Sequence, residues 1–322
     1  QAEGLLPRVV TGSSAGAIMA GILTTHTDEE LREMLNPEYI DFEWCSVFRP
    51  FQLVKGQSLL DQKVLRRFIE RNIPPITFLE AYQRTNRILN ISVSPADSHQ
   101  FPRLLNYLTA PHVLIRWAAL ASAAIPGLYP PVQLRAKNFA GKSVAYMPQN
   151  RWIDGSVHDD IPKYKVNRLH NINHYIVSQT NPYIIPFIDT TKRKTDVVSE
   201  VKYALYDTAR AWINASAAIF EKPLSLVPDM QKLTNSALSM INQSYVGDIT
   251  ISPITKLHNP LKSLAWRTHD EIRALMNEGI RATWPQIERI RIQTRISRTL
   301  DPILHNYEEL HIEQFGKPVR KA

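Results

Sequence analysis

The residues best suited to chemistry are Gly12-Ser13-Ser14-Ala15-Gly16, which fit the pattern G-x-S-x-G. In this pattern the serine occupies a sharp turn between a strand and a helix, and its hydroxyl is exposed as a nucleophile. Glycines on either side avoid collisions between a Cβ atom and nearby backbone. The first amides of the helix, the Ala15 N–H among them, point at a developing oxyanion. Ser14 is therefore a candidate nucleophile for acyl transfer, and the alternative is a glycine-rich turn without catalysis.

A serine nucleophile needs a base, and the sequence offers two kinds. A Ser-Asp/Glu-His triad would need a histidine late in the chain. The candidates are His258, His269, His305 and His311, each of which also fits an ordinary surface position. The other candidate is Asp154, which follows the apolar pair Trp152-Ile153 and precedes Gly155. Because Asp-Gly is also a common turn dipeptide, the residues alone leave the choice of base open.

The elements that would position these residues alternate between strands and helices. Apolar runs and β-branched alternation predict strands, whereas amphipathic or alanine-rich stretches predict helices. This order is typical of an α/β fold with a mostly parallel central sheet. The expected strands are 5–10, 87–93 and 174–177, and the expected helices are 15–23, 59–72 and 113–124.

The last third of the chain has a different character. Apolar residues recur at helical spacing over 198–220 and again over 287–304, with one short strand expected at 246–251. The polar stretch 189–196 separates this part from the rest. We therefore expect two parts, a catalytic domain over residues 1–190 and a mainly helical extension over residues 191–322.

Composition limits the function classes. With 322 residues and 44% hydrophobic residues the chain can bury a large core, which argues against a disordered protein. Cys45 is the only cysteine, so no disulfide forms within the chain, as suits a reducing, cytoplasmic compartment. A membrane-spanning helix needs about 18 consecutive apolar residues, and the sequence has no run of that length. The net charge of +8 suits nucleic acid or an anionic lipid surface, but no nucleic-acid motif and no metal-binding Cys/His cluster accompanies it.

Several motifs together resemble patatin-like acyl hydrolases. The resemblance rests on Gly12 to Gly16 combined with Asp154-Gly155, and it covers most of the chain. Three further segments also resemble the family: 121–131, 154–162 and 174–182. Two later segments, 247–251 and 281–285, resemble triacylglycerol lipases of the patatin type.

The resemblance implies a three-layer α/β/α sandwich and a Ser-Asp dyad with no histidine and no cofactor. Ser14 would be the nucleophile and Asp154 its base, in a water-poor pocket where a carboxylate is more basic. Triacylglycerol is the expected substrate, met at the surface of a membrane or lipid droplet. Phospholipid or lysophospholipid hydrolysis and acyl transfer would use the same acyl-enzyme, and a non-catalytic lipid-surface binding protein is the alternative of another class.

One feature departs from the family pattern. Patatin-like enzymes carry a glycine-rich oxyanion loop before the serine, whereas this sequence has no Gly-Gly pair and only eleven residues before Gly12. The sequence also begins with Gln1 rather than methionine, so we expect a fragment that lacks the first strand and this loop. Because each oxyanion donor contributes about 10²–10³-fold in rate, we expect weak activity from this chain alone.

Overall fold

The centre of the fold is strand β2 (Ile88–Pro95), every residue of which is buried. The computed structural model describes residues 3–34, 61–97, 100–126, 128–159, 161–180, 247–253 and 268–315. Strand β1 (Val9–Gly12) pairs with β2 in parallel, whereas β3 (Arg103–Leu105) and β6 (Trp152–Asp154) pair with it in antiparallel orientation. In the described residues this sheet is therefore mixed, and the expectation of a mostly parallel sheet was wrong. The three-layer arrangement stays a prediction.

Two smaller ladders lie outside this sheet. Strands β4 (Arg135–Lys137) and β5 (Ser143–Ala145) form an antiparallel hairpin. Strand β7 (Ile176–Ser178) pairs in parallel with β8 (Ile249–Ile251), which comes from the last third of the chain. The predicted strand at 246–251 thus exists, and it pairs with a strand that precedes the expected boundary at residue 190. The division into two domains stays a prediction.

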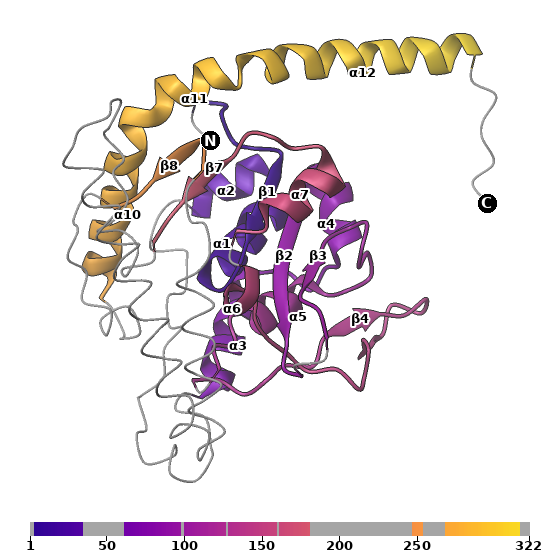
Figure 1. The fold of residues 1–322 in the computed structure, drawn as a ribbon, viewed down its shortest axis with the longest axis vertical. Coiled ribbons are helices and arrows are strands. Elements are labelled where there is room, and N and C mark those ends of the chain that lie inside the picture. Colours follow the sequence, from indigo (N-terminus) through magenta and orange to yellow (C-terminus); the bar gives the residue numbers. More distant parts are fainter. Residues whose placement is uncertain are drawn as a thin grey trace, which may run out of the picture.

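Helices α1 (Ala15–Thr25) and α5 (Ile115–Ser122) pack on β2 and on each other, as Figure 1 shows. Gly21 lets them approach, because a Cβ there would lie 2.8 Å from the side chain of Ile73 and 3.4 Å from that of Ile115. The core is completed by α3 (Gln62–Asn72) and α4 (Phe78–Thr85). The remaining helices of this part are short: α2 (Asp28–Met34), α6 (Ser156–Asp159) and α7 (Lys163–His170).

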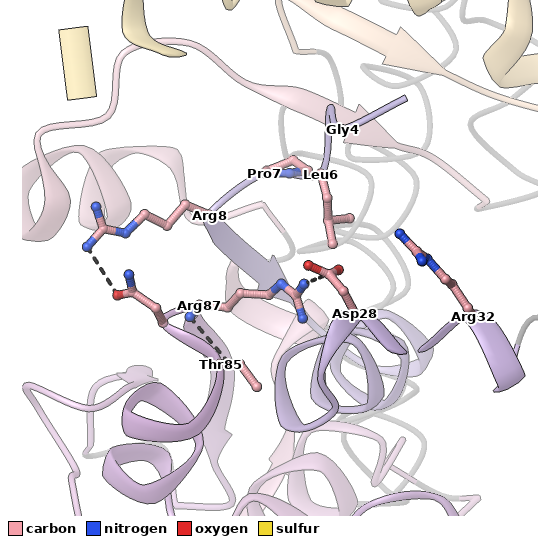
Figure 2. Close-up of a pocket in the computed structure, with 9 residues that line it drawn as sticks. Gly4, Leu6, Pro7, Arg8, Asp28, Arg32, Thr85 and Arg87 are labelled. Carbon is pink, nitrogen blue, oxygen red and sulfur yellow. Dashed lines mark hydrogen bonds and ion pairs between the residues drawn. The ribbon is translucent and has the colours of Figure 1, made fainter. Parts of the chain in front are cut away.

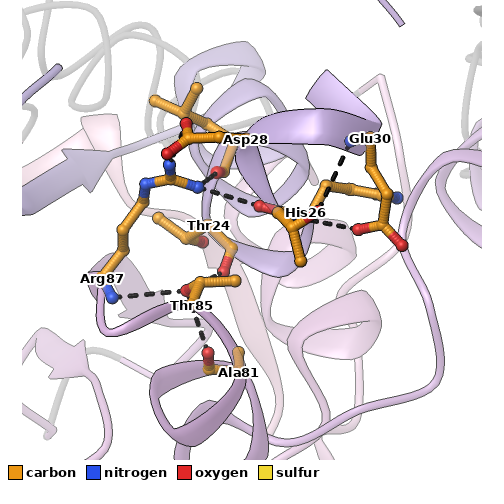
Figure 3. A network of polar contacts seen from close by, with 9 residues as sticks. Thr24, His26, Asp28, Glu30, Ala81, Thr85 and Arg87 are labelled. Atoms are coloured by element: carbon orange, nitrogen blue, oxygen red, sulfur yellow. Dashed lines mark hydrogen bonds and ion pairs between the residues drawn. The ribbon is translucent and has the colours of Figure 1, made fainter. Parts of the chain in front are cut away.

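Arg87 binds the C-terminal end of α1. The last turn of α1 holds no basic residue, but Arg87 donates hydrogen bonds to the carbonyls of Leu23 and His26 and pairs with Asp28 at 2.6 Å (Figure 3). A cation near exposed carbonyls stabilises the negative end of a helix dipole. Because Arg87 immediately precedes β2, this network ties α1 to the central strand.

The end of the described chain is helical, as the sequence predicted. Helices α10 (His269–Thr283), α11 (Ile287–Gln293) and α12 (Arg295–Phe315) follow one another, with a single 3₁₀ turn (Trp284–Gln286) between the first two. A capping box of Thr268 and Glu271 starts α10. The helical pattern expected over 198–220 and the stretch 189–196 lie outside the described residues.

Candidate active site

Ser14 adopts a strained backbone conformation between β1 and α1. Its φ of 53° and ψ of −128° place it in a region that residues with a Cβ rarely occupy. Although Ser14 stands at the N-cap position of α1, its side chain does not cap the helix. Ser14 is half-buried, and Ala15 and Gly16 after it are exposed. This is the geometry of a nucleophile elbow, in which the turn presents the hydroxyl outward.

The two glycines of the motif differ in their surroundings. A Cβ on Gly12 would lie 2.2 Å from the carbonyl oxygen of Gly16, so strand and helix come this close only because Gly12 has no side chain. A Cβ on Gly16 would meet no atom within 4 Å in the part of the chain that the structure describes. The expected steric role is therefore seen at Gly12 and not at Gly16.

Strands β1 and β6 end against the same edge of β2. Strand β3 pairs with both Ile91 and Val93 along one edge of β2. On the other edge of β2, Ile91 pairs with Gly12 of β1 and Val93 pairs with Asp154 of β6. Because β1 runs parallel to β2 and β6 runs antiparallel, their carboxyl ends point toward each other. The two ends are separated by two residues of β2, or about 7 Å. The sheet thus brings the segments that carry Ser14 and Asp154 to one place.

Asp154 is fully buried at this meeting point. Its Oδ1 accepts hydrogen bonds from the backbone N–H and the hydroxyl of Ser156, at 2.9 and 2.8 Å. Gly155 allows the chain to turn here, since a Cβ on it would lie 2.2 Å from the carbonyl oxygen of Ser92. The sequence interpretation of Gly155 as a close-approach residue agrees with this contact, and the burial of Asp154 agrees with a water-poor pocket.

The end of α5 contacts both segments. The Oγ of Ser122, a fully buried residue, accepts a hydrogen bond from the N–H of Ser14 at 3.0 Å. Two residues later, the carbonyl of Ala124 accepts the N–H of Asp154, also at 3.0 Å. Sequence reasoning missed this role of Ser122, although the segment 121–131 that contains it was singled out.

The candidate histidines lie elsewhere. His269 is on α10, His305 and His311 are on α12, and His258 is outside the described residues. In Figure 1 both helices are distant from the junction of β1 and α1.

Within the described ranges, no three His, Cys, Asp or Glu side chains are grouped as metal ligands. The helices in those ranges include none that is long and apolar enough to cross a bilayer.

A shallow cavity of about 400 Å³ lies at the opposite end of the sheet (Figure 2). Its lining includes the residues just before β1 and β2, both of which start at this end and run toward Ser14. The cavity is therefore not where an acyl group would meet Ser14. The residues that line it include three arginines: Arg8, Arg32 and Arg87.

Comparison with known proteins agrees with the resemblance found in the sequence. The sequence model of the family described as patatin-like phospholipase matches residues 1–163, which is half of the chain and includes both Ser14 and Asp154. The chain belongs to the patatin-like phospholipase family. As a patatin-like protein it is similar to triacylglycerol lipase SDP1L of Arabidopsis thaliana, with 30% identity over 92% of this chain and 38% of the relative.

Two fungal relatives are similar over the same extent. Triacylglycerol lipase 4 of Saccharomyces cerevisiae is 34% identical over 88% of this patatin-like chain and 33% of the relative. Triacylglycerol lipase ptl2 of Schizosaccharomyces pombe is 30% identical over 93% of the chain and 50% of the relative. The chain thus spans between a third and a half of the length of these curated relatives.

Proposed function

We propose that this protein is a serine acyl hydrolase that cleaves ester bonds in lipids, with Ser14 as nucleophile and Asp154 as base. The observation that carries the proposal is the strained Ser14 at the end of β1, opposite the end of β6 that holds the buried Asp154. Strain of this kind is costly, by about 1–3 kcal/mol, and is characteristic of functional turns.

The reaction has two stages. Ser14 Oγ attacks the ester carbonyl carbon while the Asp154 carboxylate takes its proton, and the ester C–O bond then breaks as that proton passes to the leaving alcohol. Water next attacks the acyl-enzyme and gives a proton to Asp154. The bond between the acyl carbon and Ser14 Oγ then breaks, the fatty acid is released, and Asp154 returns the proton to Ser14 Oγ. Two hydrogen bonds from Ser156 to Oδ1 hold the carboxylate in one orientation throughout.

The start of α1 suits both the oxyanion and a lipid. The amides of Ala15 and Gly16 lie in the first turn, where N–H groups have no partner within the helix, and no acidic side chain lies in that turn. The exposed side chains next to Ser14 are apolar, Ala15 followed one turn later by Met19 with 47% exposure. An acyl chain can therefore approach Ser14 without meeting a charge from this turn of α1.

Triacylglycerol is the proposed substrate, because three similar relatives are named triacylglycerol lipases. Phospholipid or lysophospholipid hydrolysis and acyl transfer to an alcohol are the alternatives, since each proceeds through the same acyl-serine. Such substrates gather in membranes and lipid droplets, so we propose that the protein works as a peripheral protein at one of these surfaces.

A fluorophosphonate probe tests the nucleophile directly. We expect covalent labelling of the wild-type protein, loss of labelling in Ser14→Ala, and strong reduction in Asp154→Asn. Ser143→Ala, which changes an exposed serine on the β4–β5 hairpin, is the matched control and should label normally. Absence of labelling together with binding to lipid vesicles would instead indicate a non-catalytic lipid-binding protein.

Release of fatty acid identifies the substrate. Emulsified triacylglycerol, phospholipid vesicles and lysophospholipid micelles are compared at equal ester concentration, and we expect triacylglycerol to react fastest. A higher rate on either phospholipid class would contradict that choice without affecting the dyad. Slow turnover by this chain stays a prediction, which the same assay checks on the chain and on a longer form of the protein.

A further inference from the structure

The solvent-facing side of helix α3 is strongly basic. Four basic residues against one acidic residue give this helix a net charge of +3. Its apolar residues Leu65, Phe68 and Ile69 are buried in the core, so the charged side chains gather on the opposite face. All four basic residues are exposed: Lys63, Arg66, Arg67 and Arg71.

The carboxylates near this face do not neutralise it. Glu70, the acidic residue of α3, pairs with Arg66 at 2.7 Å. Asp61 caps the helix, and its side chain accepts the backbone N–H of Lys63 at 2.9 Å. Within the part of the chain that the structure describes, neither Lys63 nor Arg67 forms an ion pair. Four cations against these two carboxylates leave a surplus of positive charge.

The β4–β5 hairpin continues the basic surface of α3. The guanidinium of Arg66 lies 4.8 Å from the centre of the Trp117 ring, and that of Arg135 on β4 lies 5.7 Å from the centre of the same ring. Residues 135–145 of the hairpin include three basic residues and no acidic one. Lys137 pairs with Glu80 at 2.7 Å, whereas Arg135 forms no ion pair among the described residues.

The tip of the hairpin presents an aromatic side chain beside a cation. Phe139 is fully exposed, and the nearby Lys142 has no ion-pair partner in the described ranges. The tip is held in shape by Asn138, whose Oδ1 accepts the N–H groups of Ala140 and Lys142 at 3.0 and 2.9 Å. In Figure 1 the hairpin projects from the rest of the described fold. Aromatic residues next to lysine and arginine are typical of segments that bind at a membrane surface.

Helix α3 begins near the proposed active site. The Nε2 of Gln62 donates a hydrogen bond to the carbonyl of Pro130 at 2.8 Å. Slightly earlier in that segment, the carbonyl of Ala124 accepts the N–H of Asp154. Three of the four basic residues of α3 lie in its first half. The charge is therefore concentrated toward the end of the sheet at which a lipid would reach Ser14.

We propose that the exposed face of α3 and the β4–β5 hairpin together form the surface with which this protein docks on anionic lipid. The inference rests on the proposed function, because it names the kind of surface on which the proposed lipase works. The lysine and arginine side chains contact the anionic headgroups, and Phe139 enters the headgroup region. A soluble polyanion would match the charge but would offer no apolar layer to Phe139.

Vesicle binding tests the role of charge. The vesicles consist of ether-linked phospholipids, so that ester hydrolysis cannot alter them during cosedimentation. We expect binding to phosphatidylcholine that contains phosphatidylserine, little binding to phosphatidylcholine alone, and weaker binding at high salt. One cation near such a surface contributes about fivefold in affinity, so Lys63→Gln combined with Arg67→Gln should weaken binding about twentyfold. Arg295→Gln combined with Arg298→Gln removes the same charge from exposed positions on α12 and should weaken it less than about threefold.

A substitution at the hairpin tip tests insertion. Phe139→Ser should weaken vesicle binding about tenfold, because the side chain no longer leaves water when the protein docks. The same variant should bind heparin, a soluble polyanion, like the wild type. Phe139→Trp keeps an aromatic ring and should bind vesicles at least as tightly as the wild type. Thermal melts show that each variant is folded.

Three results would overturn the docking surface: vesicle binding that does not depend on phosphatidylserine, wild-type binding by the Lys63 and Arg67 double variant, or wild-type binding by Phe139→Ser. Hydrolysis of a soluble ester separates this inference from the proposed function, since all these variants should keep the wild-type rate. If the wild type hydrolyses that ester but does not bind the anionic vesicles, the docking surface alone is wrong. If it binds them in the expected manner without hydrolysing any ester, the docking surface is supported and the proposed function is contradicted.

Discussion

The backbone N–H of Ser14 donates a hydrogen bond to the hydroxyl of Ser122, a residue 108 positions later in the chain, at 3.0 Å. This bond fixes the turn at the residue whose φ of 53° is strained. Because Ser122 closes α5, and Ala124 just after it accepts the amide of Asp154, one short segment sets the relative positions of both candidate catalytic residues. Ser122 therefore acts as a positioning residue in the proposed site.

Ser122→Ala should slow catalysis more than its effect on stability explains. Loss of the acceptor leaves the Ser14 N–H unpaired, at a cost of about 1–3 kcal/mol, and allows the turn to relax. We expect kcat on a soluble ester to fall about tenfold or more while KM changes little. Thr85→Ala is the control, since Thr85 donates to the carbonyls of Thr24 and Ala81 at the far end of α1 (Figure 3).

Thr85→Ala should lose about as much stability as Ser122→Ala but keep its kcat, because Arg87 still binds the C-terminal end of α1. Thermal melting of both variants provides the comparison. If kcat falls equally in the two variants, or not at all in Ser122→Ala, the positioning role is wrong.

Replacing each of three glycines of the site by alanine should change the unfolding free energy in different directions, with Gly12 and Gly155 on one side and Gly16 on the other. Gly12→Ala and Gly155→Ala would each place a Cβ 2.2 Å from a backbone carbonyl oxygen, which cannot move like a side chain. We expect each to cost about 3 kcal/mol of unfolding free energy and to abolish fluorophosphonate labelling. Gly16→Ala meets no described atom within 4 Å and, in the first turn of a helix, should be neutral or slightly stabilising. Chemical denaturation of the three variants checks this order.

The elements next to Ser14 were predictable because their signals are local. The apolar run before Gly12, the alanine- and isoleucine-containing stretch after it, and the alternation before Val93 each indicate an element over a few residues. The structure confirms them as β1, α1 and β2, shifted by a few residues at some ends.

The direction of the strands was not predictable in the same way. Whether β6 runs parallel or antiparallel to β2 depends on contacts between residues some 60 positions apart, and Trp152-Ile153-Asp154 reads the same in either case. Ser122 was missed for a similar reason. A serine in an alanine-rich helix has no local pattern that marks it as the acceptor for a distant amide. The choice between His and Asp as base came from resemblance rather than from the residues.

Removing the hydroxyl of Ser156 should weaken the orientation of Asp154. Ser156→Ala loses one of the two hydrogen bonds to Oδ1 and keeps the one from the backbone. Because a bond to a charged group contributes about 1.5–3 kcal/mol, we expect kcat to fall about tenfold with KM nearly constant. Ser156→Thr keeps a hydroxyl and should retain most of the activity. Equal losses in both variants would show that packing, rather than the hydrogen bond, matters at this position.

The stability of the fold should depend on pH through His170. Burial lowers the pKa of His170 below its ordinary value of 6.5, and its Nε2 lies 2.9 Å from Oδ1 of the buried Asn90 on β2. A histidine with a lowered pKa in the folded state binds its proton more readily when unfolded. Its contribution to stability is therefore complete above pH 6.5 and is lost as the pH falls below that value.

Melting temperatures measured from pH 7.5 to pH 5 test this dependence. The wild-type melting temperature should fall more steeply below pH 6.5 than that of His170→Gln, whose amide can still donate to Asn90 but does not titrate. His112→Gln, at an exposed position, is the control and should follow the wild-type curve. Parallel curves for the wild type and His170→Gln would mean that groups other than His170 cause the acid sensitivity.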